Sequence, residues 1–152
     1  MKTTANSASA RPLQRTRSIS LSIVLMVATM IAGLAIRFIP LGLPALIVKY
    51  GGSMLWALMI YWIVSALLPS LRLLIVALIS AALTTAVEFF KLHHSPAIDA
   101  FRLTIPGILL LGRVFSTRDI LAYWLAILIG LLIDHRICFA ANWTWYPSHR
   151  RL

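Results

Sequence analysis

Long apolar runs, separated by short polar or helix-breaking segments, dominate the chain. The runs cover about residues 18–37, 53–68, 71–90 and 119–135. A helix needs about 20 predominantly apolar residues to cross a bilayer, and these runs approach or reach that length. The pattern therefore predicts an all-α fold, a polytopic transmembrane helix bundle with about four spans.

The connections between these runs differ in kind. Residues 38–52 are rich in proline and glycine, which predicts a loop after the first span. Pro69 leaves so short a linker that the second and third spans are expected to form a tight antiparallel hairpin. Residues 99–112 include an apolar stretch that is too short to span and is interrupted by Pro106 and Gly107. We expect a short re-entrant or interfacial half-helix there.

Both ends of the chain are basic. Residues 1–17 are predicted to form a disordered basic cytoplasmic tail, and residues 137–152 an aromatic and basic tail whose rings anchor at the membrane interface. A cleaved signal peptide is the alternative interpretation of the first basic-then-apolar pattern. Its apolar region is usually about 7–15 residues long. The first run is longer and meets Arg37, which favours an uncleaved span.

Composition strengthens this interpretation. Hydrophobic residues make up 61% of the 152 residues and charged residues only 12%. Soluble domains carry roughly 45–50% apolar and about 25% charged residues, so an ordinary soluble domain is excluded. The net charge of +10 comes from basic residues that flank the apolar runs. Since no basic stripe with interleaved aromatics lies outside the runs, we predict a lipid bilayer as partner and no nucleic acid.

The span count also predicts orientation. With four spans and a cytoplasmic N-terminus, eight Lys and Arg residues lie inside and six outside, whereas five spans would give seven on each side. The positive-inside rule therefore favours four spans, with the C-terminal tail also cytoplasmic.

The chain has only four acidic residues, Glu88, Asp99, Asp119 and Asp134. Four spans place the first three on one face of the membrane, together with several arginines. Arg102 follows Asp99 by three residues, so one helical turn would pair them. We predict a charged layer as a ligand-binding site, made of six residues: Glu88, Lys91, Asp99, Arg102, Asp119 and Tyr123.

Three interpretations of this layer stay open. The first is an ion-pair lattice that only serves helix assembly, because buried charges in membranes are usually paired. The second is a polar pocket for a charged headgroup or a small anion. The third is a carboxylate pair for acid–base chemistry, which would need two acids with separated pKa values. No catalytic residue, cofactor or metal site is predicted, and the single Cys138 excludes an intrachain disulfide.

A series of short motifs runs from Tyr50 onward. It consists of Tyr50-Gly51-Gly52, Leu55-Trp56-Ala57, Pro69, Glu88, Asp99-Ala100-Phe101-Arg102, Thr104, Gly107, Leu111-Gly112, Phe115, Asp119 and Ala122-Tyr123. This order resembles the domain-of-unknown-function 2809 family of small bacterial membrane proteins over roughly residues 33–134. The section from the Asp-Ala-x-Arg motif to Leu111-Gly112 is its most specific part.

The resemblance implies a membrane location but no established activity. Two positions depart from the family pattern. Ser53 stands where an acid commonly follows the paired glycines, and Lys91 stands where a Gln is common, so that Lys91 is expected to neutralise Glu88. A weaker resemblance joins Glu88, Arg118 and Asp119 to the VanZ-like family, which is associated with the cell envelope and glycopeptide-type antibiotic resistance.

Together these observations predict a bacterial inner-membrane protein that binds an envelope lipid or a polar small molecule through an outward-facing charged layer. A structural or accessory subunit, whose charges serve only assembly, is the alternative. A small transporter, with the chain acting as a homo-oligomer, is the third possibility.

Overall fold

The computed structural model describes residues 17–40, 42–112 and 114–143, which form six helices. They are α1 (Ile19–Phe38), α2 (Ala45–Leu67), α3 (Leu73–Phe90), α4 (Pro96–Arg102), α5 (Ile105–Leu110) and α6 (Thr117–Trp143). Within these residues four helices, α1, α2, α3 and α6, are long and apolar enough to cross a membrane. The protein is therefore a multi-pass membrane protein built as a helix bundle, as its hydrophobic pattern predicts.

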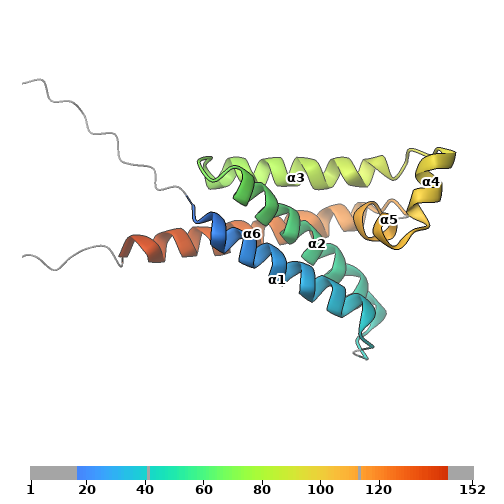
Figure 1. Cartoon of the computed structure of the whole chain (residues 1–152), viewed down its shortest axis with the longest axis horizontal. Helices are drawn as coiled ribbons and strands as arrows, with labels where there is room; N and C mark the ends of the chain where they lie inside the picture. The colour runs from blue at the N-terminus through green and yellow to red at the C-terminus, as the bar shows by residue number, and fades with distance from the viewer. Residues whose placement is uncertain (1–16, 41, 113, 144–152) are drawn as a thin grey trace, which may run out of the picture.

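The α2 helix lies at the centre of the bundle. It packs against α1, α3 and α6, and α3 also packs against α6, whereas α1 contacts α2 alone among the described helices. Figure 1 shows α2 crossing between α1 and the α3–α6 pair, with α4 and α5 together at one end. The buried core consists of Tyr61 and Trp62 from α2, Val76 from α3 and Ile127 from α6. Much of α1 exposes large apolar side chains, the surface that lipid covers in a membrane.

The start of α2 corrects the predicted loop over residues 38–52. The helix begins at Ala45, directly after Pro44, well before the predicted start at residue 53. Gly51 lies inside this helix, and a Cβ placed on it would meet Ile36 of α1 at 3.9 Å. Small residues let membrane helices approach closely, so the glycine serves helix packing here and does not break the helix.

The segment predicted as one half-helix over residues 99–112 forms two short helices, α4 and α5. Thr104 separates them, and its hydroxyl accepts a hydrogen bond from the Gly107 N–H at 3.2 Å as the N-cap of α5. The chain turns so sharply that a Cβ on Gly107 would lie 1.9 Å from the carbonyl oxygen of Phe101. This close approach requires glycine and explains why one continuous helix does not form.

The ends of the chain also differ from the predicted tails. The α6 helix continues to Trp143 and so includes the first part of the predicted tail over residues 137–152. Arg17, predicted to end the disordered tail, is buried against α2 and α6. Residues 1–16 and 144–152 lie outside the described residues, and the predictions for them stay predictions.

Candidate functional site

Glu88, in the last turn of α3, is fully buried and surrounded by donors. Its carboxylate forms an ion pair with Lys91, as the sequence predicts. It also accepts a hydrogen bond from the Tyr123 hydroxyl at 2.9 Å and from the backbone N–H of Ser116 at 2.7 Å. The Glu88 carboxylate is thus fully paired, and its contacts tie the end of α3 to the start of α6.

Asp99 and Arg102 form the predicted ion pair in α4, with 3.2 Å between Oδ1 and Nη1. The buried Arg102 guanidinium also donates to the carbonyl oxygens of Phe90 at 2.8 Å and His93 at 3.0 Å. These carbonyls belong to the end of α3 and the turn after it, where the helix leaves backbone acceptors unpaired. Arg102 therefore clamps α4 onto α3 by satisfying them.

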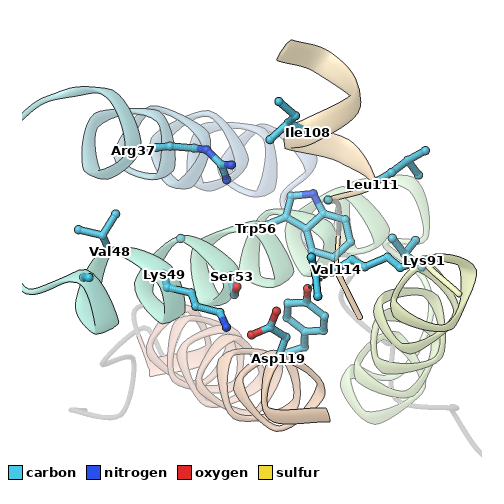
Figure 2. A pocket seen from close by; sticks show the side chains of 15 residues that line it. Arg37, Val48, Lys49, Ser53, Trp56, Lys91, Ile108, Leu111, Val114 and Asp119 are labelled. Atoms are coloured by element: carbon cyan, nitrogen blue, oxygen red, sulfur yellow. Dashed lines mark hydrogen bonds between the residues drawn. The ribbon is translucent and has the colours of Figure 1, made fainter. Parts of the chain in front are cut away.

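A cavity of about 680 Å³ opens beside these contacts, at the same end of the bundle. Its walls come from the end of α1, the first turns of α2, the end of α3, α5 with the segment after it, and the start of α6 (Figure 2). Most of the lining is apolar, with Trp56 of α2, Ile108 of α5 and Leu111 as large members. The volume falls within the 300–1,000 Å³ typical of ligand pockets.

Two cationic side chains at this cavity have no counter-ion. Arg37, at the end of α1, and Lys49, in the first turns of α2, both line it. Among the described residues neither forms an ion pair; Lys49 lies over the ring of Tyr50, with its Nζ 5.3 Å from the ring centroid. The indole N–H of Trp56 is buried and lacks a hydrogen-bond partner within the described residues. The cavity thus presents unused donors on otherwise apolar walls.

Asp119 is the acidic group of the cavity. It lies in the first turn of α6 and is only 6% exposed. Its Oδ1 atom is buried without a hydrogen-bond partner in the described part of the chain. In Figure 2 its carboxylate and the Lys49 ammonium point toward one another, yet they form no ion pair within 4.0 Å.

The opposite end of the bundle carries a second buried charge cluster. Arg17 forms an ion pair with Asp134 of α6 at 3.0 Å and donates to Ser65 of α2 at 3.1 Å and to the carbonyl oxygen of Leu71. Asp134 also accepts from the Tyr61 hydroxyl at 3.0 Å. These contacts join the start of α1 to α2 and α6.

The structure divides the six predicted site residues into two groups. Lys91, Asp119 and Tyr123 line the cavity, whereas Glu88, Asp99 and Arg102 do not. The prediction missed Arg37, Lys49, Ser53 and Trp56 as lining residues. The last three recur at helical spacing on one face of α2, together with Ala45, Val48 and Gly52. The prolines and glycines of residues 38–52 predict a loop there and so obscure this helical spacing.

Metal ligands are absent from this arrangement, since no cluster of three or more His, Cys, Asp or Glu residues occurs within the described residues.

Comparison with known proteins gave one clear relationship. No solved structure matches the chain. The more distant VanZ-like resemblance stays a prediction. Residues 42–127, more than half of the chain, match the family described as Protein of unknown function (DUF2809). This stretch contains α2 to α5 and the cavity-lining turns of α6. The chain therefore belongs to the DUF2809 family of proteins of unknown function.

Proposed function

We propose that the protein binds a membrane lipid by its phosphate-bearing headgroup in the cavity between α1, α2 and α6. The observation that carries this proposal is the pair Arg37 and Lys49, two cations that line one cavity and form no ion pair within 4.0 Å with any described residue. Both side chains are exposed and lie near helix ends beside the cavity, where they are accessible to an anionic group. A phosphate would supply the missing negative charge, and guanidinium groups bind phosphate oxygens in a bidentate geometry.

The apolar walls point to a lipid as the source of that phosphate. Trp56, Ile108, Leu111 and Val114 surround the polar groups with aromatic and aliphatic surface. A free inorganic anion would leave this surface unused, whereas the glycerol region and the first methylene groups of a lipid would cover it. Each buried methylene contributes about 0.8 kcal/mol to such binding.

The sequence left two alternatives to ligand binding, a structural role in assembly and transport. Assembly accounts for Glu88, Asp99 and Arg102, because their charges are paired within the described structure and lie outside the cavity lining. It does not account for Arg37 and Lys49. Transport would need a polar route between the two ends of the bundle. The interior between the ends contains buried apolar side chains such as Ala57 and Ile127, and the hydroxyls of the buried Ser80 and Thr84 bond to carbonyls of their own helix, which favours binding over transport.

The test is the lipid that accompanies the purified protein. Full-length protein extracted in mild detergent is examined by native mass spectrometry for bound phospholipid. We expect one bound lipid in the natural protein and its loss in the double variant Arg37→Ala/Lys49→Ala. The matched control is Arg72→Ala, which removes an exposed cation at the opposite end of the bundle and leaves the lipid bound. Equal lipid occupancy in all three proteins would overturn the proposal.

The expected size of the effect follows from the two contacts. A hydrogen bond to a charged group contributes about 1.5–3 kcal/mol, so each lost cation weakens binding roughly ten- to a hundredfold. The predicted cytoplasmic orientation of both chain ends, the bacterial inner membrane and oligomerisation are not needed for this test and stay predictions.

A further inference from the structure

The Asp119 carboxylate is unusual because it is nearly buried and has no donor. Buried polar groups almost always have hydrogen-bond partners, and an unpaired one carries the full desolvation penalty. Asp119 is 6% exposed, lines the cavity, and receives no hydrogen bond from any described residue. Such a group indicates a partner that comes from outside the chain.

A common helix-capping motif at the start of α6 would supply a hydrogen bond to the Asp119 carboxylate. Ser116 precedes α6, and its carbonyl accepts from the N–H of Ile120, which places Ser116 at the N-cap. In a capping box the acid three residues later accepts the N-cap N–H, and here that acid is Asp119. The Ser116 N–H donates to Glu88 instead, at 2.7 Å. Glu88 therefore takes the donor that Asp119 would use.

The Tyr123 hydroxyl is a second possible donor to Asp119, and it also bonds to Glu88 instead. Tyr123 follows Asp119 by one helical turn, so its hydroxyl lies on the same face of α6. That hydroxyl donates to Glu88 at 2.9 Å. Lys91 also lines the cavity, but its ammonium is paired with Glu88. The Glu88 cluster thus uses three donors near Asp119, and Lys49, which points toward Asp119, forms no ion pair with it within 4.0 Å.

The cavity therefore presents two kinds of unused charge. Arg37 and Lys49 require an anion, and Asp119 requires a donor, preferably a charged one because charge-assisted hydrogen bonds are the stronger class. Lys49 and Asp119 both line the cavity and point toward one another without forming an ion pair within 4.0 Å, so one ligand could contact both (Figure 2). A zwitterion that carries a phosphate and a protonated amine complements this pattern.

Building on the proposed lipid function, we propose that the bound headgroup carries a protonated amine beside its phosphate, as in phosphatidylethanolamine. The amine donates to the Asp119 carboxylate, and the phosphate binds Arg37 and Lys49. The aromatic pair Trp56 and Tyr123, whose ring centroids are 5.5 Å apart, forms a further wall of the cavity. Cation–π contact with these rings would bind a quaternary ammonium as well as a primary amine. Hydrogen bonding to Asp119 requires an N–H donor, which a quaternary ammonium lacks.

The experiment compares headgroups on the unaltered protein. Full-length protein in detergent is titrated with dioctanoyl phosphatidylethanolamine, its N-methyl and N,N-dimethyl derivatives, phosphatidylcholine and phosphatidylglycerol, and binding is measured by native mass spectrometry. We expect the three lipids that keep an amine N–H to bind about tenfold or more tighter than phosphatidylcholine, which has none. Phosphatidylcholine or phosphatidylglycerol binding as tightly as phosphatidylethanolamine would overturn the proposal. Phosphoethanolamine serves as the soluble headgroup and is expected to compete only weakly, because it lacks the acyl chains.

A substitution then assigns the preference to one side chain. Asp119→Asn is expected to abolish the preference for phosphatidylethanolamine over phosphatidylcholine while phosphatidic acid still binds. Asp99→Asn, the control, changes an acid at the same end of the bundle outside the cavity lining and keeps the preference. A preference that survives in Asp119→Asn overturns the assignment. If the unaltered protein binds no phospholipid at all, the proposed function itself is overturned. This outcome differs from binding without a headgroup preference, which overturns only the inference about the amine.

Discussion

Replacing Arg17 by Met tests whether a residue before the first span holds the bundle together. The Arg17 guanidinium donates to Asp134 of α6, to Ser65 of α2 and to the Leu71 carbonyl in the turn between α2 and α3. Because α1 otherwise contacts α2 alone among the described helices, this cluster is the described link between the start of α1 and α6. Its removal leaves the Asp134 carboxylate, which is 4% exposed, without its cation.

The magnitude follows from that uncompensated charge. Breaking a buried ion pair by removing one partner lowers the free energy of unfolding by about 3–5 kcal/mol. Replacing both partners by apolar residues, as in Arg17→Met/Asp134→Leu, is often nearly neutral, so the double variant should be more stable than the single one. Tyr61→Phe removes only a hydrogen bond to Asp134, and such bonds in membrane bundles contribute about 0.6 kcal/mol on average.

The assay is reversible unfolding of the full-length protein in mixed micelles with increasing sodium dodecyl sulfate, read by circular dichroism. Labelling of Cys138, which lies one turn after Asp134, gives a second measure of opening at this end. Because Cys138 is only partly buried in the folded bundle, the expected result is faster labelling in Arg17→Met than in the natural protein. Arg72→Met is the matched control, an exposed arginine at the same end. The reasoning fails if Arg17→Met unfolds within about 0.5 kcal/mol of the natural protein, or if the double variant is no more stable than the single one.

Three further predictions concern other parts of the bundle. Glu88→Gln leaves Lys91 buried without its ion pair and should lower the free energy of unfolding by about 3–5 kcal/mol in the same unfolding assay. Asp119→Asn loses no described hydrogen bond, so this variant should accumulate normally in membranes. Gly130→Val should cost about 1–3 kcal/mol, since even a Cβ at this position would lie 2.9 Å from Leu58 Cδ1; a stability equal to that of the natural protein would contradict this packing. A C-terminal reporter should be active in the cytoplasm, and activity only on the other side of the membrane would refute the predicted orientation.

Local rules were enough to predict the helices and the ion pairs within one turn. The apolar runs give the four long helices, because backbone in lipid must satisfy its own hydrogen bonds. Glu88 with Lys91 and Asp99 with Arg102 are pairs separated by three residues, so their contact follows from helix geometry.

Contacts between distant segments could not be predicted in this way. Arg17 and Asp134 are 117 residues apart, and nothing in the polar segment around Arg17 distinguishes it from the other basic residues there. The first turns of α2 were hidden for another reason. Gly51 lies inside the helix against Ile36 of α1, and only the tertiary structure distinguishes such a helical glycine from a glycine in a loop. Lys49, one of the two cations of the cavity, lies in these turns.

The spacing of the two charged ends has a consequence for the surrounding bilayer. Asp119 and Asp134 lie on one helix, fifteen residues apart, which corresponds to about 22 Å along its axis. The hydrocarbon core of an average bilayer is about 30 Å thick. Measured between these two acids on α6, the stretch is about 8 Å shorter than the core, and a short stretch is accommodated by thinning of the surrounding bilayer or by flanking side chains that extend to the interface. Thinning would bring phosphate groups inward to the level of Arg37 and Lys49, and it would favour residence of the protein in thinner regions of the membrane.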